Sequence, residues 1–181
     1  MKLPFSVDLT GRVAVVTGAG GVLMSEFARA LAACGAKVAL LGRTYENVQK
    51  LAGEITAAGG TARAYACNVL DRAAVEACHE RVLAELGPCD ILLNGAGGNH
   101  PSATTDKEYY EPGDLDADTK SFFDLDEAGV ASVFNLNFMG ILIPTQAFAS
   151  DMVTREGCNI INISSMNAYT PLTKIPAYSG A

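Results

Sequence analysis

The chain has 181 residues, of which 49% are hydrophobic and 18% charged, and it carries a net charge of −7. This composition fits one folded domain with a sizeable core and excludes a disordered chain. The negative charge argues against nucleic acid and anionic membranes as partners, because both attract basic surfaces. Five cysteines without a Cys-x-x-Cys pair indicate reduced thiols and no metal site.

The sequence contains no apolar run that we expect to span a membrane. The segment Met1–Leu9 is too short, and too interrupted by Pro4 and Asp8, to be a signal peptide. We therefore expect a soluble, cytoplasmic protein.

The first 41 residues predict a strand, a glycine turn, a helix and a second strand. The β-branched, apolar run Arg12–Thr17 favours a strand that is buried on both faces. After the glycines, Val22–Cys34 has the apolar spacing of a helix, and Gly35 follows its end. Lys37–Leu41 is again short and apolar, so we expect two parallel strands joined by a right-handed crossover.

The same alternation continues to residue 94. Regular alternation of strand and helix is typical of a doubly wound α/β parallel sheet, the Rossmann fold, with helices on both faces in three α/β/α layers. The expected elements are a helix over 44–58, a strand over 62–66, a helix over 71–86 and a strand over 90–94, with Thr44 and Asp71 as helix caps.

The alternation stops in the segment 99–126, which is rich in Asp, Thr, Tyr and Pro. It follows the carboxyl end of a strand, where ligands bind in such sheets, so we interpret it as an insertion loop on the substrate side. His100, Tyr109 and Tyr110 are candidates to contact a substrate. The equal alternative is that they only pack the loop down.

The last part of the chain predicts a helix over 125–154, with a kink at Pro144, and a fifth strand over 157–164. In a sheet of order 3-2-1-4-5 this strand is an edge, and its isoleucines are poor edge residues. We therefore expect residues 1–181 to be one dinucleotide-binding domain that is truncated after the fifth strand, with further strands beyond Ala181.

The glycine turn at residues 17–21 stands between a strand and a helix. Helix N-termini bind anions, and glycine lets the backbone approach a pyrophosphate, so Gly18, Gly20 and Gly21 are candidate cofactor contacts. Leu23 is a further candidate and stands where the third glycine of Gly-x-Gly-x-x-Gly would be. A tight turn without a ligand is the alternative.

Arg43 directly follows the second strand. An acidic residue there would bind the ribose 2′-hydroxyl of NAD, whereas a basic residue would accept the 2′-phosphate of NADP. The arginine therefore favours NADP(H) over NAD(H). The alternative is a solvated residue at the entry of a helix.

The fifth strand ends in hydroxyls at Ser164 and Ser165, and Tyr178 returns after a loop. A serine on a rigid strand end and a phenol beside it can hold one substrate oxygen between two O–H groups. Such a pair polarises a carbonyl or deprotonates an alcohol without a metal.

Over essentially its whole length the chain resembles the short-chain dehydrogenase/reductase family. The likeness rests on four features: Thr17–Gly18 in the turn, Asn94–Gly97 at a strand end, Asn137–Gly140 in a helix, and the spacing of Ser165 to Tyr178. The resemblance implies that Tyr178 is the general acid/base and that Ser165 holds the same substrate oxygen. It implies that Asn137 holds a water through its backbone.

The resemblance also implies a cofactor lining. Its residues are Asn94, Ala96 and Gly97, with Asn68 and Val69 beside the adenine. The family more often has aspartate at the position of Asn68.

The sequence departs from the family pattern in its glycine turn and at its end. The family turn reads Thr-Gly-x-x-x-Gly-x-Gly, and Val22 and Met24 occupy its last two glycine places. We expect Met24 to crowd the helix against the sheet or to narrow the pyrophosphate groove. Gly95 replaces the second asparagine of Asn-Asn-Ala-Gly. The lysine of Tyr-x-x-x-Lys falls one position beyond Ala181, and we expect a working enzyme only where the chain continues with it.

A finer resemblance is to bacterial sugar-acid oxidoreductases, the D-mannonate oxidoreductase (fructuronate reductase) group, with gluconate 5-dehydrogenases as near relatives. It rests on residues 94–101, 122–126, 135–137, 164–168 and 171–176. It implies a sugar-acid substrate and a homotetramer or homodimer. Candidate substrate contacts are His100, Ser165 and Asn167, and Lys107, Lys120 and Lys174 stay open for the carboxylate. A non-catalytic NADP-binding sensor is the alternative from another class.

Overall fold

The computed structural model describes residues 7–181, so most of the segment considered as a signal peptide lies outside the described residues. The chain divides into two compact units. The first, here called the sheet unit, comprises Met1–Ala96 and Ile141–Ile163. The second, here called the loop unit, comprises Gly97–Gly140 and Ser164–Ala181.

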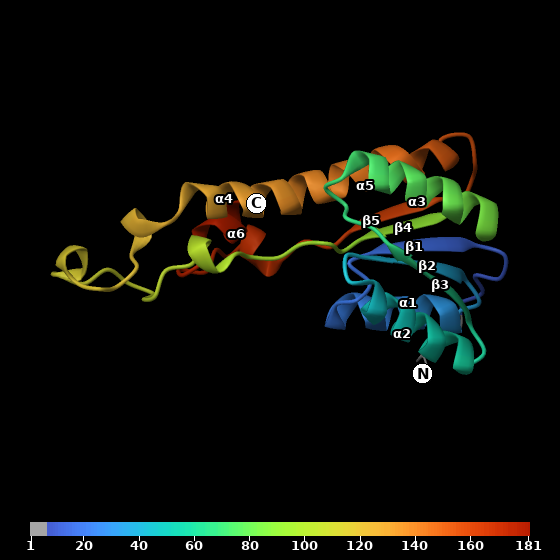
Figure 1. Ribbon diagram of the computed structural model, residues 1–181, viewed down its shortest axis with the longest axis horizontal. Coiled ribbons are helices and arrows are strands. Elements are labelled where there is room, and N and C mark those ends of the chain that lie inside the picture. Colours follow the sequence, from blue (N-terminus) through green and yellow to red (C-terminus); the bar gives the residue numbers. More distant parts are fainter. Residues whose placement is uncertain (1–6) are drawn as a thin grey trace. The chain divides into compact units, whose positions relative to one another are not determined.

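The sheet unit contains a parallel sheet of five strands in the order β3-β2-β1-β4-β5, which confirms the expected doubly wound order (Figure 1). In the register, Val15 of the central strand pairs with Ala39 and with Leu92. The strands are β1 (Val13–Thr17), β2 (Lys37–Gly42), β3 (Thr61–Ala66), β4 (Ile91–Asn94) and β5 (Asn159–Asn162).

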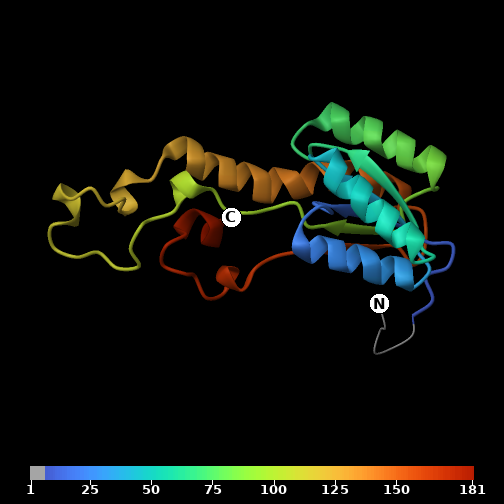
Figure 2. The same cartoon turned by 60° about the horizontal axis from the view of Figure 1, so that its bottom comes forward.

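Helices cover both faces of this sheet, so the expected three layers are present. Figure 1 shows α1 and α2 on one face and α3 and α5 on the other, and the turned view in Figure 2 agrees. Asp71 caps α3, as predicted, and accepts a hydrogen bond from Ala74 N at 3.1 Å. Thr44 is the N-cap residue of α2, as predicted, but its side chain makes no capping hydrogen bond. The helices are α1 (Val22–Ala33), α2 (Tyr45–Ala57), α3 (Arg72–Glu85) and α5 (Gly140–Phe148).

The central strand β1 is buried along its whole length, as its β-branched residues predict. The face that α1 presents to this core is made of Met24, Ala28 and Ala32. Among the apolar residues of the helix, Val22 is 89% and Leu23 55% exposed, whereas Leu31 packs partly against the core. The apolar spacing thus located the helix, and small alanines form most of the face that packs closely on the sheet.

A buried carboxylate fixes the start of β1. Asp90 is 2% exposed, accepts a hydrogen bond from Val13 N at 2.8 Å, and pairs with the guanidinium groups of Arg12 and Arg155. Burial alone would raise the pKa of Asp90. The Val13 hydrogen bond and the two arginines outweigh burial and hold the pKa below its usual value.

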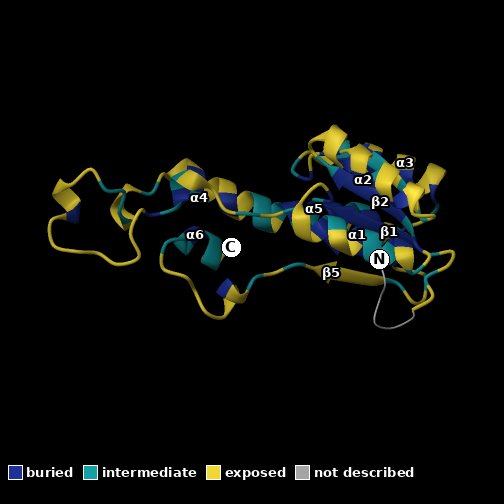
Figure 3. Cartoon of the chain, turned by 90° about the horizontal axis from the view of Figure 1, so that it is seen from below, coloured by how far each residue is buried: buried dark blue, intermediate teal, exposed yellow. Residues whose placement is uncertain are grey.

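The fifth strand is an exposed edge, as the predicted strand order requires. All of β5 is exposed, and Figure 3 shows it in yellow beside the dark core strands. Ile160 is 38% and Ile161 45% exposed. An apolar groove with about 760 Å³ of empty space, partly open to solvent, lies between α1 and this edge and is lined by Phe27, Leu31 and Ile161 among others. The strand is shorter than the predicted 157–164.

The expected long helix is interrupted earlier than at the predicted proline kink. α4 (Glu127–Phe134) passes into a π-helical turn, η4 (Asn135–Met139), before α5, and a short 3₁₀ turn, η5 (Ala149–Asp151), follows. Pro144 lies inside α5. Proline lacks an N–H and clashes with the carbonyl four residues earlier, so the helix adjusts on its N-terminal side.

One stretch of the described chain meets the length and composition of a membrane span, although the sequence alone led us to expect none. It is Glu127–Asp151, which has 25 residues and contains an 18-residue window with a mean hydropathy of 1.4. Core helices of soluble proteins meet the same criteria, so this finding is weak evidence for a span.

The loop unit gathers segments that are far apart in the sequence. α4 contacts both η1 and α6, and α6 also contacts η1 and η6. Ala103, Val133 and Ala177 form its small buried cluster, against which Tyr178 packs. Besides α4 and η4 its elements are η1 (Pro101–Ala103), η2 (Asp114–Asp116), η3 (Phe122–Asp124), η6 (Met166–Ala168) and α6 (Pro176–Gly180).

Candidate active site

The glycine turn joins the carboxyl ends of β1 and β4. Gly18 has a φ of 68°, and a Cβ there would lie 2.9 Å from the backbone of Ala96, so only glycine fits. The hydroxyl oxygen of Thr17 accepts hydrogen bonds from Gly95 N at 3.0 Å and Ala96 N at 3.2 Å. These contacts fix the two strand ends beside the start of α1.

The N-terminus of α1 is open. Its cap is Gly21, which has no side chain to satisfy the first N–H groups, and its first turn has no acidic residue. Gly20, Gly21 and Leu23 are all exposed. Free N–H groups and the helix dipole therefore point toward solvent, which is the arrangement that binds a phosphate.

Met24 does not point toward this N-terminus. Its side chain is 4% exposed and lies in the core. A Cβ at Gly95 would overlap the thioether of Met24, with the Met24 Cγ 2.6 Å away. Met24 stands where the family has a glycine, and Gly95 stands where the family has an asparagine. The side chain of Met24 thus fills the space that the glycine leaves open. The structure relieves the expected crowding in this way, and the pyrophosphate groove is not narrowed by this side chain.

Three further candidates lie at the same carboxyl edge of the sheet. Arg43 follows β2, is exposed, and makes no ion pair with the residues that the structure describes. Asn68 follows β3, is exposed, and uses its side-chain oxygen to accept a hydrogen bond from Leu70 N at 3.2 Å. Val69 is 4% exposed, so its side chain packs in the core.

Asn94 is a buried polar residue with one unused acceptor. It is 1% exposed, and its amide nitrogen donates to Thr145 Oγ1 at 3.0 Å and to Asn162 Oδ1 at 2.9 Å. Its Oδ1 has no partner among residues 7–181. A buried acceptor of this kind calls for a donor. Together with the open α1 N-terminus, it makes these residues fit a dinucleotide, with phosphate at the helix and a donor at Asn94.

Ser165 and Tyr178 stand in contacting elements of the loop unit. Ser165 caps η6, where its oxygen accepts a hydrogen bond from Asn167 N at 3.2 Å, and its O–H remains able to donate. Tyr178 lies in α6, which contacts η6, and both residues are half-buried. The neighbouring Ser179 has a buried hydroxyl without a partner in the described chain.

Asn137 is held by the backbone of the loop. Its Oδ1 accepts from Gly98 N at 2.9 Å, and its Nδ2 donates to Gly98 O at 3.0 Å. A Cβ at Gly97 would lie 2.8 Å from Asn137 Oδ1, which explains the glycine at that position. The N–H groups that close the π-turn donate to the carbonyl oxygens of Asn135, Leu136 and Phe138. None of these bonds uses the carbonyl oxygen of Asn137.

The remaining predicted substrate contacts differ in exposure. His100 is exposed and lies with its Nδ1 2.8 Å from Ser102 Oγ, where it also caps η1. Asn167 is 3% exposed. Sequence reasoning missed the clamp of Thr17 and the partners of Asn94, because these bonds depend on the register of strands that are distant in sequence.

Comparison with known proteins gives the class. The model of the short chain dehydrogenase family matches residues 12–181. An uncharacterized oxidoreductase of Haemophilus influenzae is 51% identical over 181 residues, which are 100% of this chain and 63% of that protein. The UxuB protein of Bacillus subtilis, also described as an uncharacterized oxidoreductase, is 50% identical over 179 residues, 99% of this chain and 63% of its own length. The chain therefore belongs to the short-chain dehydrogenase family.

Solved structures agree with the fold. A Haemophilus protein described as a candidate D-mannonate oxidoreductase, solved with bound NAD, has a TM-score of 0.93 and 52% identity, covering 96% of this chain and 62% of its own. A metagenomic short-chain oxidoreductase in complex with NADP has a TM-score of 0.79 and 31% identity, covering 95% of this chain and 70% of its own. The chain spans about 63% of the length of the curated relatives named above.

Proposed function

We propose that the protein is an NAD(P)-dependent oxidoreductase that moves a hydride between nicotinamide and the secondary alcohol or ketone of a sugar acid, of the D-mannonate/D-fructuronate kind. The observation that carries the proposal is the placement of Ser165 and Tyr178 in contacting elements of the loop unit. The open glycine turn of the sheet unit supports the nucleotide part. The name of the Haemophilus structure supports the substrate class.

The proposed roles follow from the chemistry of the side chains. Tyr178 passes its phenolic proton to the substrate oxygen during reduction and takes it back during oxidation. Ser165 donates a hydrogen bond to the same oxygen and fixes its position. We propose that the backbone carbonyl of Asn137 holds a water that exchanges the proton with solvent. A bound nicotinamide would supply or accept the hydride.

A phenol with its usual pKa of about 10 is a poor base at neutral pH. A neighbouring cation lowers such a pKa. In the family pattern this cation is the lysine of Tyr-x-x-x-Lys, at the fourth position after Tyr178. The proposed activity therefore requires a cation beside the phenol of Tyr178.

For the cofactor we propose NADP(H) rather than NAD(H). Arg43 is exposed at the end of β2 and has no carboxylate partner in the described residues, so its guanidinium can fork onto a 2′-phosphate. Related structures hold either NAD or NADP. Dissociation constants for NADPH and NADH, with Arg43→Ala beside the unmodified protein, test this. We expect the variant to lose about tenfold in affinity for NADPH and little for NADH.

The activity is tested with the full-length protein. D-Fructuronate and 5-ketogluconate are mixed with NADPH or NADH, and the absorbance of the reduced nicotinamide is followed. We expect turnover of a sugar acid, and Tyr178→Phe should reduce kcat by about 10²–10⁴ without changing cofactor affinity. Tight nucleotide binding without turnover of any sugar acid or ketone would instead favour a non-catalytic NADP-binding sensor. We also propose that the protein is cytoplasmic and forms a homodimer or homotetramer. Light scattering, which gives the molar mass in solution, tests the oligomeric state.

A further inference from the structure

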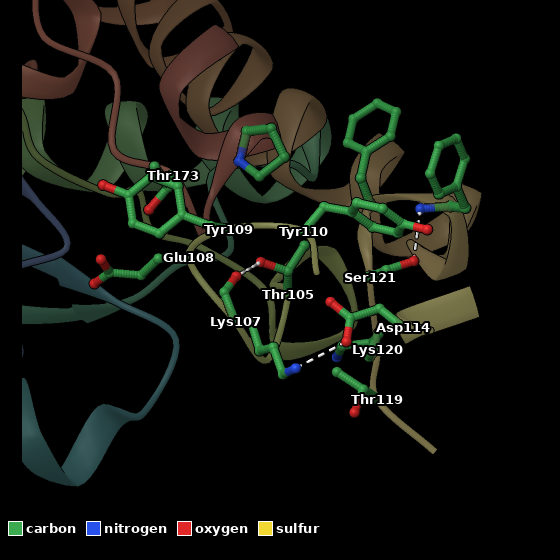
Figure 4. Close-up of a pocket in the computed structure, with 13 residues that line it drawn as sticks. Thr105, Lys107, Glu108, Tyr109, Tyr110, Asp114, Thr119, Lys120, Ser121 and Thr173 are labelled. Atoms are coloured by element: carbon green, nitrogen blue, oxygen red, sulfur yellow. Dashed lines mark hydrogen bonds and ion pairs between the residues drawn. The ribbon is translucent and has the colours of Figure 1, made fainter. Parts of the chain in front are cut away.

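The loop unit contains a hollow that the proposed roles of Ser165, Tyr178 and Asn137 do not use. It has about 550 Å³ of empty space, part of it open to solvent, and residues of the segment 105–123 line most of it (Figure 4). Because the hollow is open to solvent, it can receive one part of a substrate without enclosing the whole molecule.

The lining combines rings, hydroxyls and charges. Tyr109 and Tyr110 are 73% and 58% exposed, and their hydroxyls make no hydrogen bond within the described chain. Thr119 and Thr173 add hydroxyl groups, and Glu108 adds a carboxylate. Aromatic faces that pack on carbon–hydrogen groups, surrounded by donors and acceptors, suit a polyhydroxylated chain.

Only one of the three candidate lysines is a free cation in this hollow. Lys107 lies 2.7 Å from Glu111 and 2.8 Å from Asp114, so its charge is already neutralised. Hydrogen bonds to Asp114 and Glu111 raise the pKa of Lys107 above its usual value. Lys120 donates one hydrogen bond to Pro101 O at 2.7 Å and has no carboxylate within ion-pair distance among the residues described.

The hollow adjoins the helix that carries the tyrosine. Pro176 lines it and is the first residue of α6, two positions before Tyr178. Lys174 does not line the hollow, and its backbone oxygen accepts a bond from Thr105 N at 2.9 Å. Both the hollow and α6 belong to the loop unit, so their adjacency is internal to one compact body.

We propose that this hollow is the subsite for the part of the substrate that lies away from the reacting carbon, and that Lys120 binds the carboxylate of a sugar acid there. This inference rests on the proposed function and names the residue that selects acids over neutral sugars. Two ammonium hydrogens of Lys120 remain for a carboxylate, which forms charge-assisted bonds. The tyrosine hydroxyls, Glu108 and the threonines then face the hydroxyl groups of the chain.

The experiment compares Lys120→Met with Lys50→Met, a matched loss of charge on the exposed surface of α2. In the full-length protein, kcat/KM is measured for a keto sugar acid and for the corresponding neutral keto sugar. We expect Lys120→Met to lower kcat/KM for the acid by about tenfold or more through KM, and to change the neutral sugar less than about twofold. Lys50→Met should change neither, and NADPH affinity should stay constant in both variants.

The outcomes separate this inference from the proposed function. Equal losses for the acid and the neutral sugar, no loss at all, or a selective loss in Lys174→Met instead, would overturn the role of Lys120 while the activity stands. If the protein turns over no sugar acid, the subsite can still be tested by binding. Equilibrium dialysis then measures the affinity of the unmodified protein and of Lys120→Met for the acid. Binding that does not weaken in the variant, or no binding to either, would refute the subsite.

Discussion

The packing of Met24 on Gly95 gives the sharpest prediction for the stability of the sheet unit. The φ of Gly95 is not in the left-handed region, so alanine there has no backbone strain. Its Cβ would nevertheless overlap the thioether of Met24, which is itself 4% exposed and surrounded by the core. Because the methionine has no open space to enter, Gly95→Ala should lower the free energy of unfolding by about 1–3 kcal/mol, the usual cost of overpacking.

The double mutant shows whether the contact with Met24 causes the loss of stability in Gly95→Ala. Met24→Ala alone should cost about 2–5 kcal/mol, because it empties a buried site. In the Met24→Ala background the new methyl group of Gly95→Ala enters the vacated space, so its cost should disappear or become a gain of a few tenths of a kcal/mol. The two substitutions should therefore be coupled by about 1–3 kcal/mol.

Urea denaturation of all four proteins measures this cycle, with the midpoint as the readout and unchanged m values as the check on comparability. Gly53→Ala is the matched control, because Gly53 lies inside α2 and a Cβ there meets nothing within 4 Å. It should stabilise the helix by about 1 kcal/mol. If Gly95→Ala costs the same with and without Met24, the explanation by this contact is wrong.

Three further outcomes follow from single contacts. Thr17→Val leaves the N–H groups of Gly95 and Ala96 without their acceptor, so we expect a loss of about 1–3 kcal/mol in urea unfolding and weaker nucleotide binding by fluorescence titration. The pKa of Asp90 is lower in the folded protein than in the unfolded chain, so ionised Asp90 stabilises the fold fully above the unfolded carboxyl pKa of about 3.9. This stabilisation is lost as the pH falls from there through the lower folded pKa. The free energy of unfolding of Asp90→Asn should therefore depend less steeply on pH in acid titration. Asn137→Asp places a carboxylate against Gly98 O, so the loop unit should exchange its amide hydrogens faster than in Asn137→Gln.

The architecture of the sheet unit could be predicted from the sequence because it depends on local signals. Short β-branched runs, glycine turns and helical spacing recur in order, and the strand order follows from the crossover rule. The exposed edge at β5 also followed from that order. The inner face of α1 did not follow, because Val22 and Leu23 are more hydrophobic than the alanines that the sheet requires at close approach.

The side-chain contacts of the sheet unit and of the candidate site could not be predicted in the same way. Asp90 pairs with Arg12 and Arg155, which lie 78 and 65 residues away in the sequence. The choice among the three lysines depends on which of them already has a carboxylate partner. Lys107 and Asp114 are seven residues apart in a loop without a regular period, so no spacing rule brings them together.

The two departures from the family pattern show how such contacts change a conclusion drawn from sequence. Taken alone, the methionine at a glycine place predicts a crowded helix or a narrowed groove, and the glycine at an asparagine place gives no indication of a link to it. In the structure the side chain of Met24 occupies the space above Gly95, so each substitution makes the other possible. The N-terminus of α1 remains open to a phosphate as a result. A comparison of nucleotide affinity between the unmodified protein and Met24→Ala should therefore give values within about twofold, provided that both remain folded, since this side chain is directed to the core and not to the ligand.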